Sequence, residues 1–93
     1  MFIGTLIFEI YISESNSLKE KRMIISSIKD RIRKRFNVAV SELDHLDKWQ
    51  RAVLGIVTIA NEHKVVESVL HKIFSILDSS SDFEVIAYQY DYM

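Results

Sequence analysis

Residues 2–12 read FIGTLIFEIYI, a run of β-branched, aromatic and aliphatic residues that predicts a β-strand. Successive side chains of a strand point to opposite faces of its sheet. Leu6 and Phe8 therefore lie on one face and Ile3 and Ile7 on the other, so both faces are apolar. A strand with this pattern is expected in the centre of a sheet.

A second stretch of the same character, RAVLGIVTIA at residues 51–60, predicts another central strand. Gly55 in its middle has no side chain and allows a neighbouring group to approach the backbone closely. Residues 36–43 (FNVAVSEL) and 83–92 (FEVIAYQYDY) predict two further strands. Small residues occupy one face of 36–43, which favours an edge position, and residues 44–50 form a polar connection to the next strand.

Two amphipathic stretches predict helices between these strands. Ser17 and Glu20 have the spacing of a capping box, in which the two side chains bind backbone N–H groups at the start of a helix. This helix is expected to run to about Arg35 and to stop at Asn37 in a left-handed conformation. Its buried arc at helical spacing consists of Leu18, Ile24, Ile25, Ile28 and Ile32.

The second helix is expected to run from about Glu62 to Asp78, with Asn61 as its N-cap. The full order is strand, helix, strand, strand, helix, strand. This order predicts an α+β, ferredoxin-like split βαβ fold with antiparallel strand order 4-1-3-2 and both helices on one sheet face. We expect one such domain over residues 1–93. The apolar stripe of the second helix consists of Val66, Val69, Leu70, Ile73 and Leu77.

The composition favours a cytoplasmic protein. The chain has 93 residues, a net charge of −1, no cysteine and no proline. The absence of a disulfide framework favours a reducing compartment, and no apolar run approaches the ~20 residues of a membrane span. The apolar N-terminal stretch lacks the basic leader and the small-residue cleavage site of a signal peptide.

The net charge conceals a strong asymmetry. Residues 19–35 carry a net charge of +6, whereas the rest of the chain carries −7. At helical spacing, four of the cations fall within an arc of about 80°, on a stripe about 21 Å long that is suited to a phosphate backbone. These four are Lys19, Arg22, Lys29 and Arg33. The nucleic-acid-binding residues predicted from the segment are Lys19, Lys21, Arg22, Lys29 and Arg33.

A solvated helix face is the alternative interpretation of this segment. It explains the cations at residues 33–35 well, because the helix dipole favours positive charge at the C-terminal end. It explains Lys19, Lys21 and Arg22 poorly, because the N-terminal end of a helix favours anions. An acidic protein is an alternative partner to RNA for the same residues.

Two further groups of residues lie on or beside the polar connection. Asp44, His45 and Asp47 have donor types that bind divalent metals, but three residues on one hairpin do not define a site, and we predict no metal. Trp49 lies between two cations. It either stacks on a base or, as we favour, anchors the loop on the sheet or on a partner subunit.

The last strand carries Tyr88, Tyr90 and Tyr92 on one face, where they pack either in the core or at a subunit interface. The chain has no glycine-rich phosphate loop, no nucleophile elbow and no cysteine. We therefore predict no enzymatic activity, no small-molecule substrate and no cofactor.

Three stretches together resemble the YlxP-like family of small bacterial proteins of unassigned function. They are SLKEKR at 17–22, RFNVAVSELDHLDKWQRAVLG at 35–55 and VIAYQYDY at 85–92. The resemblance covers nearly the whole chain and implies a ferredoxin-like fold. Genes of this family often lie beside those of a translation initiation factor and a ribosome-binding factor, which implies a link to translation by association.

These observations predict a non-enzymatic RNA- or ribosome-associated accessory protein that acts through its basic first helix. The alternative is a homo-oligomeric structural or protein-interaction module, and an enzyme with a site between subunits is the third interpretation. We expect a homo-oligomer, most simply a homodimer, because two helices cover one sheet face and leave an apolar face open. The second copy is expected either to cover this face or to extend an edge strand.

Overall fold

Strands β1 (Phe2–Tyr11) and β3 (Arg51–Ala60) pair antiparallel along their full length in the centre of a four-stranded sheet. The outer strands are β2 (Ala39–Asp44), which pairs with β3, and β4 (Glu84–Tyr92), which pairs with β1. In this computed structural model, which describes residues 1–93, the sheet order is β2-β3-β1-β4. The predicted strand order and the central position of the two apolar strands are confirmed.

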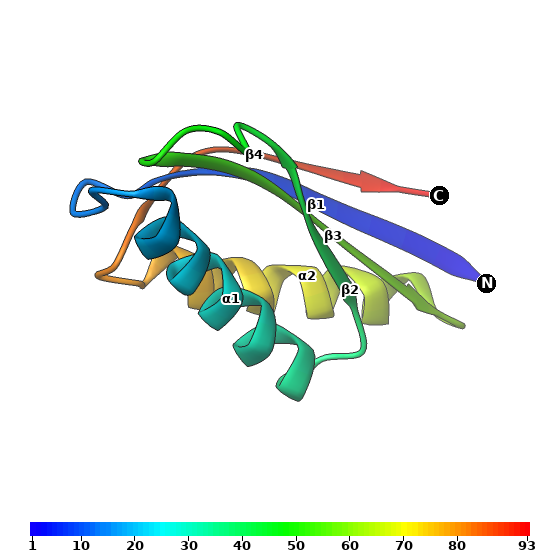
Figure 1. Ribbon diagram of the computed structural model, residues 1–93. Helices are drawn as coiled ribbons and strands as arrows, with labels where there is room; N and C mark the ends of the chain where they lie inside the picture. The colour runs from blue at the N-terminus through cyan, green and yellow to red at the C-terminus, as the bar shows by residue number, and fades with distance from the viewer.

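Helices α1 (Leu18–Arg35) and α2 (His63–Asp78) lie on the same side of the sheet (Figure 1). Helix α1 packs against β2, and α2 packs against β1 and β3. The element order and the two layers confirm the predicted ferredoxin-like α+β fold. Neither helix is both long and apolar enough to cross a membrane.

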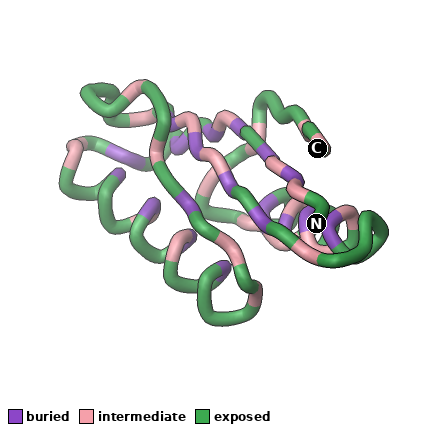
Figure 2. The backbone as a smooth tube through the Cα atoms, turned by 90° about the vertical axis from the view of Figure 1, so that its right-hand side faces the viewer, coloured by how far each residue is buried: buried purple, intermediate pink, exposed green.

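The core fills the space between the sheet and the two helices. Buried residues recur at every second position along β1 and β3 and once per turn along the helices, so buried and exposed segments alternate in Figure 2. Gly4 lets α2 approach β1 closely, because a Cβ at this position would overlap Val66 and lie 2.9 Å from Leu70 Cδ1. The predicted stripe of α2 is confirmed: Val66, Leu70, Ile73 and Leu77 are buried and Val69 is half-buried.

The predicted left-handed stop after the first helix and the predicted start of the second strand are corrected. Helix α1 ends at Arg35 as predicted, but Phe36 is its C-cap, and the Phe36 N–H donates to Ile32 O over 2.9 Å. Strand β2 consequently begins at Ala39 and not at residue 36. The chain leaves the helix in an extended conformation at Phe36, so no left-handed residue is needed, and Asn37 does not adopt that conformation.

The N-cap of α2 also differs from the prediction. Glu62 occupies the cap position, because its carbonyl oxygen accepts the first hydrogen bonds of the helix from Val65 N and Val66 N. The Glu62 side chain makes no capping hydrogen bond. The prediction of Asn61 is therefore wrong by one residue.

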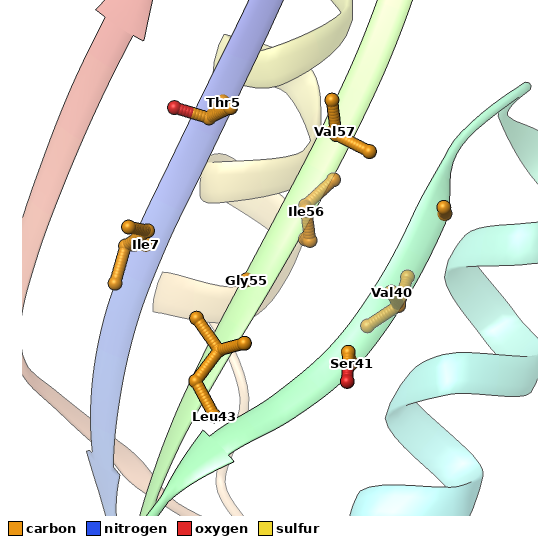
Figure 3. A pocket seen from close by; sticks show the side chains of 9 residues that line it. Thr5, Ile7, Val40, Ser41, Leu43, Gly55, Ile56 and Val57 are labelled. Atoms are coloured by element: carbon orange, nitrogen blue, oxygen red, sulfur yellow. The ribbon is translucent and has the colours of Figure 1, made fainter.

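The sheet face opposite the helices is uncovered. A hollow of about 270 Å³ lies on it, between apolar side chains of β1, β2 and β3 (Figure 3). Leu43 lies over Gly55, since a Cβ on Gly55 would come within 2.7 Å of Leu43 Cδ1. This contact confirms the close approach predicted for the glycine. Ile7, Val57 and Leu43 remain substantially exposed on this face.

Strand β4 presents its three tyrosines to the helix layer. Tyr88 and Tyr90 pair in register with the core residues Phe8 and Leu6 of β1, which confirms the predicted common face. All three rings pack against α2, so their packing partner is within the chain. The ring-centroid distances are 4.4 Å for Tyr88–Phe74, 4.9 Å for Tyr90–His71 and 5.1 Å for Tyr92–His63.

This packing predicts a specific loss of stability at alkaline pH. Burial raises the pKa of Tyr90, and the nearby Tyr92 and Tyr88 raise it further; burial, and then Glu67, raise the pKa of Tyr92. The ordinary value is 10.0. The folded state therefore holds the phenol protons of Tyr90 and Tyr92 more tightly than the unfolded chain does. Their contribution to the free energy of unfolding is complete below pH 10.0 and is lost as the pH rises through the folded-state pKa values.

We predict that the Y90F/Y92F double variant loses less stability than the parent between about pH 9 and about pH 11, measured by urea unfolding. An equal alkaline loss in both proteins would contradict this origin of the pH dependence.

Candidate nucleic-acid interface

The predicted cations lie on α1, and side-chain hydrogen bonds fix the residue at which this helix begins. Ser17 Oγ accepts a hydrogen bond from the Glu20 N–H over 3.1 Å, as the capping box predicts. The Glu20 carboxylate accepts the N–H of Asn16, which precedes the helix. Its charge is thereby held at the N-terminal end. Of the predicted buried arc, Ile25, Ile28 and Ile32 are buried, and Leu18 and Ile24 are half-buried.

Lys19, Arg22, Lys29 and Arg33 line one side of α1, and we call these four residues the cationic flank. Three of them are exposed, and Lys29 is half-buried. None of the four forms a salt bridge or a side-chain hydrogen bond within the chain. The flank therefore presents positive charge to the surroundings without an internal counter-ion.

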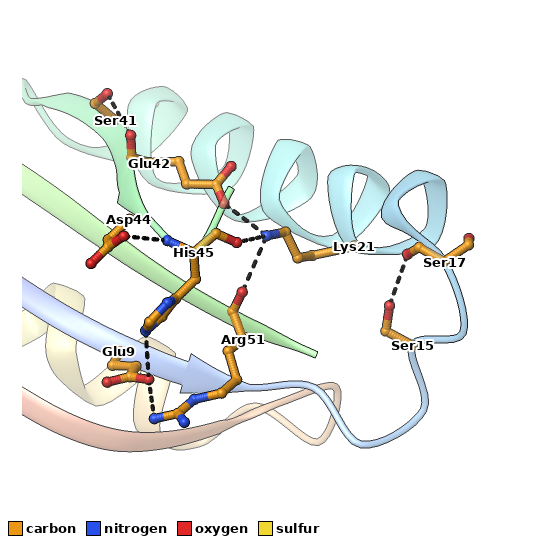
Figure 4. Close-up of polar contacts among 9 residues, drawn as sticks. All are labelled: Glu9, Ser15, Ser17, Lys21, Ser41, Glu42, Asp44, His45 and Arg51. Carbon is orange, nitrogen blue, oxygen red and sulfur yellow. Dashed lines mark hydrogen bonds and ion pairs between the residues drawn. The ribbon is translucent and has the colours of Figure 1, made fainter. Parts of the chain in front are cut away.

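Lys21 was also predicted to bind nucleic acid, and the structure corrects this prediction. Only 1% of the residue is exposed. Its Nζ donates to the main-chain oxygens of His45 (2.6 Å) and Arg51 (3.1 Å) and lies 3.0 Å from the Glu42 carboxylate (Figure 4). Three oxygens thus surround an ammonium group that has three N–H groups. The charge is used inside the protein and is not available to an external phosphate.

The contacts of Lys21 connect α1 to the β2–β3 hairpin. Glu42 belongs to β2, His45 to the loop and Arg51 to the first position of β3. A buried charge is costly unless it is paired and hydrogen-bonded. The N-terminal part of α1 is therefore held beside this loop.

A second polar cluster lies on the open face of the same hairpin. Glu9 of β1 forms an ion pair with the Arg51 guanidinium, and its carboxylate lies 3.4 Å from His45 Nε2. His45 has a φ of 61°, in the left-handed region, and its N–H donates to Asp44 Oδ1 over 2.7 Å. Glu9 was not singled out from the sequence, although it is the only acid within an otherwise apolar strand.

The hairpin residues with metal-binding side chains are not grouped around a common point. Asp44 binds the His45 backbone, and His45 faces Glu9. No three histidine, aspartate or glutamate side chains are placed so that they could hold a metal ion.

Trp49 is 55% exposed and contacts no other aromatic ring. It lines a hollow at the end of the open face together with Tyr11, Lys48, Gln50 and Arg51. That Trp49 anchors the loop, on the sheet or on a partner subunit, stays a prediction.

Gln50 is the residue that ties this loop to the rest of the chain. Its Nε2 donates to the main-chain oxygens of Ser13 (3.1 Å) and Ser15 (3.3 Å). The Gln50 main-chain oxygen also accepts the N–H of Ile12 over 2.8 Å. The loop is consequently fixed from both sides, by Lys21 and by Gln50.

The fold and these features define a small ferredoxin-like α+β protein with a cationic first helix. Residues 3–90 match the family described as "Protein of unknown function (DUF503)", and the chain belongs to this family. It is similar to the uncharacterised protein YlxP of Bacillus subtilis strain 168, with 34% identity over 82 residues that cover 88% of this chain and 89% of that protein. The resemblance to the YlxP-like family is thereby confirmed.

Two solved structures share the fold. Both are of SnoaB, a cofactor-independent oxygenase from Streptomyces nogalater. One has a TM-score of 0.54 and 10% identity, covering 100% of this chain and 92% of that chain. A mutant of SnoaB has a TM-score of 0.53 and the same identity, with coverages of 98% and 90%. Likeness at this identity shows the fold alone.

The prediction of a protein without enzymatic activity is contradicted by this comparison. SnoaB is a cofactor-independent oxygenase with a chain of the same fold. The absence of a phosphate loop, a nucleophile elbow and a cysteine therefore does not exclude catalysis on such a scaffold.

We predict that the Lys21→Met substitution lowers the free energy of unfolding by about 3 kcal/mol or more, the range for breaking a buried ion pair. It leaves the Glu42 carboxylate without its cation and removes the donor to two main-chain oxygens. Urea unfolding measures the change.

Arg22→Met is the matched control, because it removes an exposed cation one position further along the helix. It is expected to change stability by no more than about 0.5 kcal/mol. Equal effects of the two substitutions would show that Lys21 does not hold the hairpin.

Proposed function

We propose that the protein binds RNA, as a ribosome-associated or other cytoplasmic RNA-binding protein, through the cationic flank of α1. The observation that carries this proposal is that Lys19, Arg22, Lys29 and Arg33 lie on one side of a helix without internal counter-ions. Outside residues 19–35 the chain is net negative. A polyanion is therefore attracted to this helix and repelled by the remainder of the surface.

The position of the charges along the helix also favours an external anion. Lys19 and Arg22 lie in the first turns of α1, where the positive end of the helix dipole disfavours cations. The charge of Lys21 is balanced by Glu42, whereas Lys19 and Arg22 have no acidic partner. A bound phosphate would offset the cost at this end of the helix. Phosphate contacts of this kind position a nucleic acid without reading its sequence.

We also propose that a second copy of the chain covers the open face of the sheet. The apolar hollow beside Gly55 favours this, since Ile7, Val57 and Leu43 are left substantially exposed around it. Four strands about 4.8 Å apart, with about 3.3 Å per residue, give a face on the order of 600 Å². This is comparable to the ~800 Å² that each partner contributes to a standard stable interface.

The first prediction concerns RNA affinity. Replacing all four residues of the cationic flank with glutamine is expected to weaken binding to single-stranded RNA regardless of sequence. The slope of log affinity against log salt becomes shallower by up to about 0.7 for each lost phosphate contact, hence by nearly 3 in total. Fluorescence anisotropy at several salt concentrations measures both quantities.

A charge-matched control separates the location of the charges from their number. Replacing Lys34, Arg35, Lys64 and Lys72 with glutamine removes the same charge from other exposed positions. We expect this variant to keep most of the affinity and of the salt slope. If the two quadruple variants bind RNA alike, or if neither the parent nor a variant binds it, the proposal is wrong.

The second prediction concerns self-association. The parent is expected to be a dimer by light scattering at micromolar concentration, and Val57→Lys is expected to be a folded monomer, because Val57 lines the hollow. Met23→Lys places the same charge on α1, where 65% of the residue is exposed, and should leave the dimer intact. A parent that is strictly monomeric at high micromolar concentration would overturn the proposed dimer.

A further inference from the structure

We propose that the hollow around Trp49 binds an unpaired base of the RNA, stacked on the Trp49 ring; this inference rests on the proposed function. The hollow has a volume of about 420 Å³ and is lined by Tyr11, Lys48, Trp49, Gln50 and Arg51. Tyr11 and Arg51 are directly paired across β1 and β3, so they form a rigid floor at the end of the sheet. The other three residues follow one another on the loop.

The aromatic side chains of the hollow are free to accept a flat ligand. Trp49 is 55% exposed and Tyr11 37%, and neither ring packs against another aromatic side chain of the chain. In contrast, the tyrosines of β4 are engaged with α2. Exposed aromatic rings in a cationic groove are the means by which proteins bind single-stranded nucleic acids, since every base has a face that stacks.

The polar groups of the hollow suit a nucleotide. Lys48 is exposed and forms no ion pair, and the Arg51 guanidinium is oriented by Glu9. Lys48 is therefore free to pair with a phosphate beside the stacked base, whereas the charge of Arg51 is already matched by Glu9. The Gln50 amide N–H groups are directed to Ser13 O and Ser15 O, which leaves its carbonyl oxygen as an acceptor for a base edge.

Lys21 connects this hollow to the cationic flank. Its Nζ holds His45 O and Arg51 O, and it lies between Lys19 and Arg22 in the sequence. Figure 4 shows Lys21 joined to His45 and Arg51, so the N-terminal part of α1 is tied to both ends of the segment that carries Trp49. The proposal therefore requires a single strand to pass from the flank around the hairpin to the hollow, both of which lie at this end of the molecule. A double helix would not fit the proposal, because its bases are paired and stacked within the duplex.

The test uses Trp49 as its own probe, because it is the only tryptophan in the chain. Titration with a short single-stranded oligoadenylate is expected to quench the tryptophan fluorescence, whereas inorganic polyphosphate of matched charge is expected to bind without the same quenching. Equal quenching by both polyanions, or none by oligoadenylate under conditions where anisotropy shows binding, would overturn the stacked base.

Trp49→Ala is expected to lower the affinity for oligoadenylate roughly tenfold or more with an unchanged salt slope, since stacking releases no counter-ions. Trp49→Phe should restore part of the affinity. Tyr88→Ala is the control, because Tyr88 is similarly exposed, at 58%, on a different strand. A Trp49→Ala variant that alters self-association and leaves RNA affinity unchanged would assign the ring to a subunit interface and overturn the proposal.

The variant of the cationic flank distinguishes failure of the base site at Trp49 from failure of the proposed RNA binding. With its four cations replaced by glutamine, the protein should bind more weakly but show the parent's quenching at saturating oligoadenylate. Loss of affinity in the flank variant together with unaltered affinity in Trp49→Ala would leave RNA binding in place and exclude the base site.

Discussion

The ammonium group of Lys21 is the contact on which the arrangement of helix α1 and the β2–β3 hairpin depends. It is buried, and its neighbours come from β2, the hairpin loop and the start of β3. Desolvating such a charge is tolerated only where every donor has an acceptor, so the geometry of the three oxygens is tightly constrained. The surfaces proposed to contact RNA, one on the helix and one on the loop, are therefore held in a fixed relation.

Helix α1 and the sheet each have one face in the core and one face that is free. The buried side of α1 packs on β2, and its cationic flank lies in the helix layer. The apolar hollow beside Gly55 lies on the opposite side of the sheet (Figure 3). RNA on the flank lies in the helix layer, whereas a second copy would cover the open face, which also carries the Trp49 hollow at one end. A second copy seated beside Gly55 must therefore leave the Trp49 end of this face free for the proposed base.

The periodicity of the sequence was sufficient to predict the fold, but it did not predict the polar contacts between elements. Lys21 lies at helical spacing with the buried residues Ile25, Ile28 and Ile32, so the periodicity alone would have predicted that it is buried. We predicted an exposed position because lysine is charged. The pairing of Glu9 with Arg51 depends on the register of β1 and β3, which apolar alternation does not determine. The N-cap of α2 was predicted one residue too early because Asn61 has the better capping side chain, whereas the hydrogen bonds of the helical backbone begin at Glu62.

The attachment of the hairpin has a consequence for how the protein can diverge. Two of the three acceptors of Lys21 are main-chain oxygens, which every amino acid provides. The side chain at position 51 can therefore be exchanged without removing its hydrogen bond, and position 45, with a φ of 61°, accepts residues that tolerate the left-handed region, such as Asn, Asp and Gly. Side chains that point outward at this end of the sheet can therefore change while Lys21 still holds the loop in place.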